Sequence, residues 1–426
     1  MIVAAIVLNL LKSRSPYPAP LHKPAATACT EHWVGSWAAS PSGVSLTQHL
    51  ADQTLRMIIA PHLGGDTLRV HLSNRYGTAP VQLGPVTVGL RGAGASLVAG
   101  SARPVTFGGQ PSVATPPGGD VVSDPVKLSF APFRDLAISV HVPGAVKYPD
   151  EHLSTRQTSY LSPRGSGDQS AQSSGSAFTQ RTTGRFSTGW YFLDGVDVRA
   201  PGSTGAVAAF GDSITDGFQA TSGGSEQLAT IDTNGRYPDD LARRLILARI
   251  PLSVLNAGIG GNQLLRSSLP LFGPKGLSRL RSDALAQAGV SDVIALMGIN
   301  DIARGASASQ LIAAYKQLID RAHGAGVAIQ LGTLTPTGGV PAPGYAGAAA
   351  YSVREQVNRW IRTQRFSDGI VDFDAAVRDP HDQSAIESAY NGGDHLHYDP
   401  AGYRALARAV NLASLARPNC VPAQRP

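Results

Sequence analysis

Four short segments of this 426-residue chain group polar residues, three of them at the ends of strand-like apolar runs and the fourth after the last predicted strand. The segments are Gly211–Ser213, Asn256–Asn262, Gly298–Asp301 and Asp394–His397. They supply in turn a hydroxyl, closely spaced glycines, a side-chain amide, and an imidazole three residues after a carboxylate. Ligands of a parallel sheet bind outside the carboxyl ends of its strands, so the four segments would meet at one site. Such a set of groups suits nucleophilic attack assisted by a general base.

The roles of the reactive groups follow from their chemistry. Ser213 lies on a predicted strand-to-helix turn, where its hydroxyl can project into solvent. His397 would accept the proton of Ser213 and later return it to a leaving group, while Asp394 would hold the tautomer of the imidazole. Two structural alternatives stay open at this point, because Ser213 could cap the following helix and His397 could be a hydrogen-bonded structural histidine.

The glycine and amide segments also permit two interpretations. Glycines after the second strand would let a ligand oxygen approach backbone N–H groups closely. Gly261 could instead serve only a tight turn, and Asn300 could be a turn residue bonded to its own backbone.

The elements that would position these residues alternate between strand and helix from Ala206 onward. The predicted strands are Ala206–Phe210, Ser253–Ala257, Asp292–Met297, Val327–Gly332 and Gly369–Phe373. They are mostly uninterrupted apolar runs, as expected for a parallel sheet covered on both faces. The clearest helix is predicted over Ser309–His323, with Gly324 ending it, and a last helix begins at Pro400 with Asp399 as its cap. The series predicts a doubly wound α/β domain.

The preceding region, from about Trp33 to Arg199, reads as β-structure. Runs with strand-like patterning are Thr54–Ala60, Thr67–Ser73, Pro85–Leu90, Val126–Phe130, Leu136–Val142 and Trp190–Val198. Glycine and proline clusters separate them, which predicts a β-sandwich or jelly-roll-like domain, and Gly165–Gly184 is expected to be a surface loop. We therefore predict a leader over residues 1–28, a β-sandwich accessory domain over 29–200 and a catalytic domain over 201–426.

The four segments together resemble the SGNH, or GDSL-type, esterase and lipase superfamily over about Ala206 to Ala416. The resemblance implies a flavodoxin-like fold, a Ser213–His397–Asp394 triad and hydrolysis of carboxylic esters through an acyl-enzyme, with no cofactor and no metal. It further implies that the N–H groups of Ser213 and Gly261 and the side chain of Asn300 form the oxyanion hole. We interpret Asp212 and Asp301 as residues that brace loops.

One departure from the family pattern is visible. Many members read Asp-Gly-x-His, whereas this chain reads Asp394-His395-Leu396-His397. His395 brings a second imidazole near the site, where it could shape the leaving-group side or contribute to a metal cluster with Asp399. His-x-His lacks a convincing third ligand elsewhere in the sequence, which disfavours the metal. A Gly-x-Ser-x-Gly elbow and a phosphate-binding loop are both missing from the sequence.

The N-terminal sequence and the cysteines bear on localisation. The apolar run Ile2–Leu11 has the length of a signal-peptide core, although no basic residues precede it, and Ala26-Thr27-Ala28 could be a cleavage site. A short buried strand is the alternative. Export would allow a disulfide between Cys29 and Cys420, with lipid attachment at Cys29 as a weaker alternative. We expect a secreted or cell-envelope protein.

The charge composition limits the classes of binding partner that we expect. Lys and Arg number 36 against 30 Asp and Glu, and the scattered excess of six gives no support to nucleic-acid binding. The expected substrate is a small ester, an acylated carbohydrate or a lipid, and no transmembrane span is expected in the mature chain. Trp33, Trp37 and Trp190 would more readily fill a core than contact a polymer. An acyltransferase, a lipase or lysophospholipase, and a wall-binding protein with a residual hydrolase domain are the rival functions.

Overall fold

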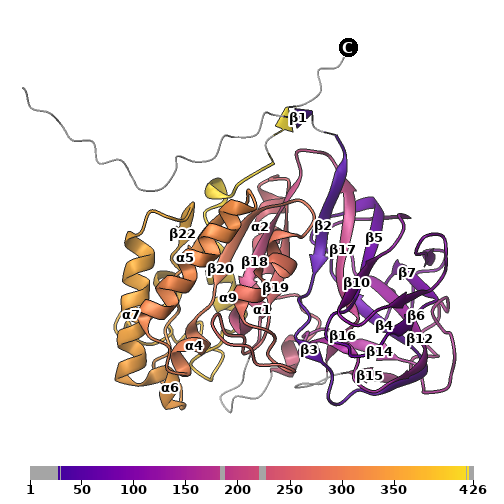
Figure 1. Ribbon diagram of the computed structural model, residues 1–426, viewed down its shortest axis with the longest axis horizontal. Coiled ribbons are helices and arrows are strands. Elements are labelled where there is room, and N and C mark those ends of the chain that lie inside the picture. Colours follow the sequence, from indigo (N-terminus) through magenta and orange to yellow (C-terminus); the bar gives the residue numbers. More distant parts are fainter. Residues whose placement is uncertain (1–26, 29, 183–187, 220–226, 419, 422–426) are drawn as a thin grey trace, which may run out of the picture.

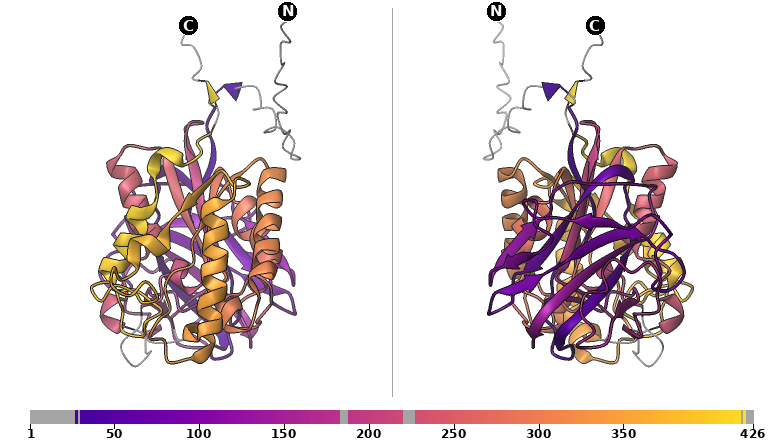
Figure 2. Two further views of the ribbon diagram at one scale, coloured as in Figure 1. Left: turned by 90° about the vertical axis from the view of Figure 1, so that its left-hand side faces the viewer. Right: turned by 90° about the vertical axis from the view of Figure 1, so that its right-hand side faces the viewer.

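The computed structural model describes residues 27–28, 30–182, 188–219, 227–418 and 420–421. An antiparallel β region, drawn from indigo to magenta in Figure 1, lies beside a parallel sheet flanked by helices. The right-hand view of Figure 2 looks onto the β region. The fold class predicted from the sequence, a doubly wound α/β domain preceded by an all-β domain, is confirmed.

Two larger antiparallel sheets form most of the β region. One sheet contains β10 (Gly119–Val122), β5 (Gly65–Asn74), β17 (Leu193–Ala200), β2 (His32–Ala38) and β11 (Val126–Phe130). The other contains β15 (Gln180–Thr182), β14 (Ser159–Leu161), β4 (Leu50–Ile59), β12 (Leu136–Val146), β7 (Val86–Leu90) and β8 (Arg103–Val105). Leu68 and Val70 of β5 share one buried cluster with Met57 of β4 and Ile138 of β12. The sheets thus enclose a common core, as in a sandwich.

Smaller sheets complete this region. They are formed by β16 (Gly189–Tyr191), β13 (Asp150–Leu153) and β3 (Gly43–Val44), and by β6 (Val81–Leu83) with β9 (Val113–Thr115). The predicted single strand Trp190–Val198 is wrong, because it is divided between β16 and β17. The break lies at Phe192, whose φ of 61° does not fit an extended strand. Residues 183–187 lie outside the described residues, so only part of the predicted loop Gly165–Gly184 can be compared.

The second half of the chain forms a five-stranded parallel sheet in the order β19-β18-β20-β21-β22. Its strands are β18 (Gly205–Gly211), β19 (Leu252–Gly258), β20 (Val290–Leu296), β21 (Ala328–Gly332) and β22 (Gly369–Val371). The five predicted strands are confirmed, with shifted ends. Because the chain order along the sheet is 2-1-3-4-5, the connectivity is flavodoxin-like and the order reverses beside β18.

Helices cover both faces of this sheet, since successive residues of its strands point to opposite sides. Val207 and Ala209 pack with α2 (Tyr237–Leu247), α8 (Phe373–Val377) and α9 (Pro400–Ala409). Ala208 and Phe210 pack with α3 (Gly276–Leu280), α5 (Ala308–Gly324) and α7 (Ala348–Thr363). Asp399 caps α9 through the N–H of Gly402, as predicted. The remaining helical segments are short: α1 (Ser213–Asp216), α4 (Ile299–Ala303), α6 (Pro343–Ala346), η1 (Leu228–Thr230), η2 (Arg281–Leu285) and η3 (Leu412–Ser414).

The β region packs directly on the edge of the parallel sheet. Ala39, just after β2, forms a bridge with Asn256 of β19. A Cβ at Gly35 would lie only 2.7 Å from Leu255 Cδ1, so this close approach requires glycine. The edge strand β19 is therefore covered by β2.

Two short strands, one near each end of the part of the chain that the structure describes, pair with each other. β1 (Thr27–Ala28) pairs in parallel with β23 (Cys420–Val421), with Thr27 opposite Cys420. The rest of the predicted leader and Cys29 lie outside the described residues, so the signal peptide and the disulfide stay predictions. Within the described ranges, no helix combines the length and apolar character needed to cross a bilayer.

Candidate active site

The nucleophile candidate lies at the start of the short helix that follows β18. Ser213 is the first residue of α1 and is 9% exposed. The cap of this helix is Asp212, whose Oδ1 accepts from the N–H of Ile214 over 3.0 Å. The alternative in which Ser213 caps the helix is therefore wrong, and its hydroxyl is available for another partner.

That partner is His397, 184 residues later in the chain. His397 Nε2 lies 2.9 Å from Ser213 Oγ, and His397 Nδ1 lies 2.6 Å from Asp394 Oδ2. A carboxylate can only accept, so Nδ1 carries the proton and Nε2 is left to accept from the serine hydroxyl. His397 therefore contacts a hydroxyl on one side and a carboxylate on the other, which is the pairing a general base needs and a purely structural histidine does not. The three predicted residues Ser213, His397 and Asp394 are brought together in one chain of hydrogen bonds.

The Asp394 carboxyl is kept ionised by its surroundings. Burial on its own raises the pKa of this carboxyl, but the hydrogen bond and charge of His397 outweigh that effect. Backbone N–H groups of His397 and Leu396 also donate to Asp394 Oδ1, over 2.8 and 3.0 Å. Together they lower the pKa of Asp394 to about 2. The carboxylate can thus orient and stabilise a protonated imidazole without taking its proton.

The glycine-rich turn after β19 lies against α1. A Cβ at Gly258 would be 2.2 Å from the backbone nitrogen of Asp216, so these backbones are in close contact. Gly261 has a φ of +69°, and a Cβ there would approach Phe272 to 2.8 Å. Gly261 therefore does serve a tight turn, because both its conformation and its surroundings require glycine. The turn nevertheless lies beside the helix that carries Ser213.

Asn300 is directed at the same turn and does not bond to its own backbone. It lies in α4 and is 6% exposed, and its Nδ2 donates to the main-chain oxygen of Asn262 over 3.0 Å. One N–H of the amide is used in this way and a second is left over. The structure thus places Asn300 next to Gly261, although the donation of either group to a substrate oxygen stays a prediction.

Two acidic neighbours brace the loops, as the sequence predicts. Asp301 accepts from the N–H groups of Leu264 and Leu265, over 2.7 and 2.9 Å, which fixes the chain after the glycine turn. Asp212, which caps α1, is 1% exposed, and this burial raises the pKa of its carboxyl to about 7.

A buried arginine beneath the site was not found from the sequence. Arg279 donates to the main-chain oxygens of Gly211 and Ala257 over 2.7 and 2.8 Å, and to Asn262 Oδ1 over 2.9 Å. It therefore ties together the ends of β18 and β19, which carry the nucleophile and the glycine turn. A lone arginine in a short helix gives no sequence signal for this role.

A second missed contact comes from the β region. His152 of β13 is 3% exposed, and its Nε2 lies 3.1 Å from Asp216 Oδ1 at the end of α1. Its Nδ1 lies 2.6 Å from the main-chain oxygen of Ser40. The β region thus contacts the helix that bears Ser213.

The alternative metal cluster is not assembled. His395 is exposed and its Nδ1 lies 3.0 Å from Asn391 Nδ2, while Asp399 is occupied in capping α9. Among the residues that the structure describes, no three His, Cys, Asp or Glu side chains gather as they would around a metal ion.

Comparison with known proteins places these motifs in a family. Residues 209–405 match the model of the GDSL-like Lipase/Acylhydrolase family. No curated protein matches the chain.

Several solved structures are similar to about half of the chain. They include a carbohydrate acetylesterase from Sinorhizobium meliloti, with 16% identity, a TM-score of 0.39 and coverage of 48% of this chain and 96% of that one. An aryl esterase from M. smegmatis has 17% identity, a TM-score of 0.39 and coverage of 48% and 96%. A lipase/acylhydrolase from Enterococcus faecalis has 18% identity, a TM-score of 0.34 and coverage of 48% and 93%. As its motifs predicted, residues 209–405 form a hydrolase domain of the GDSL-like lipase/acylhydrolase family, preceded by an antiparallel β region.

Proposed function

We propose that this chain is a serine esterase that cleaves carboxylic esters of short acyl groups through an acyl-enzyme. The observation that carries the proposal is the continuous hydrogen-bonded series from Ser213 Oγ through His397 to Asp394, at 2.9 and 2.6 Å. Both distances are within the range needed for proton transfer and for orienting a base.

In the proposed reaction, Ser213 Oγ attacks the ester carbonyl as its proton passes to His397 Nε2. Asp394 stabilises the imidazolium that forms, because its carboxylate already accepts from Nδ1. The carbonyl oxygen becomes an oxyanion and receives the N–H groups of Ser213 and Gly261 and the free N–H of Asn300. His397 then gives its proton to the departing alcohol, and water cleaves the acyl-enzyme by the same steps in reverse order.

Aromatic side chains around the site favour a short acyl group. The ring of Phe218 packs edge-on against His397, with centroids 4.8 Å apart. Phe272 occupies the space above Gly261, as its 2.8 Å approach to a Cβ there indicates. One ring lies beside the base and the other beside the glycine turn, and we infer that they leave room for a short acyl chain.

The alcohol part of the substrate is less constrained. Trp37 and Trp190 are 7% and 5% exposed and pack edge-to-face at 4.7 Å, so the core-filling prediction is correct for both and neither presents a face to a polymer. We therefore propose small soluble esters first and O-acetyl groups on carbohydrate second.

The test is hydrolysis of p-nitrophenyl esters of increasing acyl length by the wild type and by Ser213→Ala. We expect activity that is highest on acetate or butyrate and that Ser213→Ala abolishes. A Ser213→Ala variant with wild-type turnover would remove the proposed mechanism, and a preference for long chains would favour a lipase. Adding an alcohol acceptor separates hydrolysis from acyl transfer, because transfer dominating at low alcohol concentration would identify an acyltransferase.

We also propose that the chain is exported and that Cys29 and Cys420 form a disulfide. The pairing of β1 with β23 supports this, because it brings the neighbourhood of Cys420 next to residues 27–28. Mass spectrometry of the secreted protein should give a chain that begins after Ile2–Leu11 and gains two mass units on reduction. An intact N-terminus in the cytosolic fraction would contradict export.

A further inference from the structure

The side-chain amide of Asn300 has a second partner outside the residues assigned so far. The phenol oxygen of Tyr345 lies 2.7 Å from Asn300 Oδ1, while Asn300 Nδ2 is 3.0 Å from the main-chain oxygen of Asn262. A carbonyl oxygen can only accept, so the amide nitrogen must face Asn262 and the amide oxygen must face Tyr345. The phenol is therefore the donor. Turning the amide end for end would set its oxygen against the main-chain oxygen of Asn262 and lose that hydrogen bond.

The residue that supplies this phenol is held close to the helix it serves. Tyr345 belongs to α6, and a Cβ at its neighbour Gly344 would lie 2.4 Å from the main-chain oxygen of Ala303. Ala303 is the last residue of α4, the helix that carries Asn300. The absence of a side chain at Gly344 thus lets α6 rest directly on α4. Thr337 Oγ1 also donates to the main-chain oxygen of Tyr345 over 2.8 Å.

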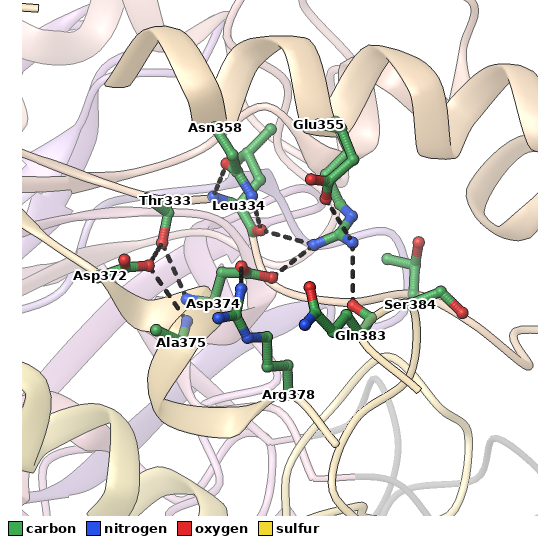
Figure 3. A network of polar contacts seen from close by, with 12 residues as sticks. Thr333, Leu334, Glu355, Asn358, Asp372, Asp374, Ala375, Arg378, Gln383 and Ser384 are labelled. Carbon is green, nitrogen blue, oxygen red and sulfur yellow. Dashed lines mark hydrogen bonds and ion pairs between the residues drawn. The ribbon is translucent and has the colours of Figure 1, made fainter. Parts of the chain in front are cut away.

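The segment that leads into α6 is fixed by a buried polar network (Figure 3). Asn358 of α7 exchanges two hydrogen bonds with the main chain of Leu334, at 2.7 and 2.8 Å. Arg354, 1% exposed, donates to Asp374 over 2.6 Å and to the same Leu334 oxygen over 3.2 Å. This network fixes the main chain at Leu334, in the segment between β21 and α6.

We propose that Tyr345 is a positioning residue of the oxyanion hole, whose hydroxyl fixes the Asn300 amide so that its remaining N–H faces the substrate oxygen. The inference rests on the proposed function, because it assigns Tyr345 a role only through Asn300. Donation to Oδ1 also polarises the amide and strengthens its N–H groups as donors. Burial raises the pKa of the Tyr345 phenol, so the hydroxyl stays protonated and able to donate at neutral pH.

The main test is Tyr345→Phe, which removes only the hydroxyl. We expect kcat on a p-nitrophenyl ester to fall about tenfold, the worth of one ordinary hydrogen bond, with KM changed less than twofold. The same change in an Asn300→Ala background should have no further effect, because the group that Tyr345 positions is already gone. An equal loss in both backgrounds, or a wild-type kcat for Tyr345→Phe, would overturn the proposal.

Two further variants serve as controls for the Tyr345→Phe experiment. Tyr351→Phe removes a phenol hydroxyl from a 39% exposed residue of α7 and should leave kcat and the unfolding temperature unchanged. Thr337→Val keeps the phenol but removes the anchor of its main chain, and should give a smaller loss of kcat that also disappears in the Asn300→Ala background. If Ser213→Ala is inactive while all Tyr345 and Thr337 variants match wild type, the positioning role fails and the esterase function stands; an active Ser213→Ala would remove the function itself.

Discussion

Two histidine–aspartate pairs contact opposite ends of the four-residue helix α1, and only one of them is suited to catalysis. His397 bonds Ser213 at the first residue of the helix, and His152 bonds Asp216 at the last. The two pairs differ in the group that the histidine contacts besides its aspartate. His152 faces two acceptors, the Ser40 carbonyl and the Asp216 carboxylate, so both of its nitrogens must carry protons. His397 faces a hydroxyl on one side and keeps a nitrogen that can accept.

The comparison shows that a histidine beside a carboxylate is not by itself a general base. Burial alone lowers the pKa of His152, but the charge and hydrogen bond of Asp216 outweigh it and raise that pKa. The result is a buried imidazolium–carboxylate ion pair that joins β13 of the β region to the nucleophile helix. His397 differs because its neighbour Ser213 can both give and receive a proton. The predictions that follow use this contrast.

The largest effect is expected from His397→Ala. Removal of the base should lower kcat/KM on p-nitrophenyl acetate about 10⁴-fold or more, as losses of triad members do, because Ser213 then keeps its proton. The unfolding temperature should stay close to that of wild type. His381→Ala, at an exposed histidine, is the matched control and should retain full activity. Substantial turnover by His397→Ala would mean that another group acts as the base.

His152→Ala should show the opposite pattern. It leaves Asp216 buried without its histidine donor, and breaking a buried ion pair costs about 3–5 kcal/mol of unfolding free energy. Activity per folded molecule should fall less than tenfold. Chemical denaturation and active-site titration measure the two quantities separately.

The same pair makes a pH-dependent contribution to stability. Because the folded pKa of His152 is raised, its stabilisation is complete below an unfolded value of roughly 6.5 and is lost as the pH rises through the folded pKa. His152→Ala should therefore remove part of the decline in wild-type stability on the alkaline side. A decline of the same size in both proteins would contradict an ion pair at this position.

Asn300→Ala should remove one oxyanion donor and lower kcat by roughly a hundredfold or more, equivalent to about 2.7–4 kcal/mol of activation free energy. The effect should lie in kcat and not in KM, since the donor serves the transition state. Unchanged circular dichroism and unfolding temperature would exclude misfolding as the cause. Normal turnover would take Asn300 out of the site.

The smallest effect is expected at acid pH from Asp394. Its folded pKa of about 2 lies below an unfolded value near 3.9, so its contribution is present above about pH 4 and is lost as the pH falls towards 2. This difference in pKa corresponds to about 2.6 kcal/mol, which solvent screening of the partly exposed carboxylate reduces to about 2 kcal/mol. Asp394→Asn should flatten this part of the stability curve, measured by denaturant unfolding between pH 2 and pH 5. The His152 and Asp394 contributions thus disappear at opposite ends of the pH range.

The site was more predictable than the contacts that support it. Ser213 directly follows β18 at the carboxyl edge of a parallel sheet, where ligands bind, and the Asp-x-x-His spacing marks Asp394 and His397 before the last long helix. Tyr345 and His152 carry no such signal. Tyr345 stands 45 residues from Asn300 on a four-residue helix, and His152 reaches Asp216 from another sheet. Their roles depend on tertiary packing, which local patterns do not encode.

The β region shows the same limit. Leu136–Val142 alternates and packs regularly, so it was predicted, whereas β2 was not assigned as a strand. Its Gly35 weakens the strand signal but is required by the approach of Leu255. Similarly, only the positive φ of Phe192 separates β16 from β17, and a phenylalanine in sequence favours a continuous strand.

The connection between the two regions has a consequence for assembly. β17 ends at Ala200 and β18 begins at Gly205, so residues 201–204 are the whole covalent link. Fully extended, such a link reaches roughly 14 Å. With so short a tether, the antiparallel sheets stay within reach of the hydrolase half of their own polypeptide, where β2 covers the β19 edge. Any movement of the two halves apart would have to break the contact between β2 and β19 and change the conformation of residues 201–204 together.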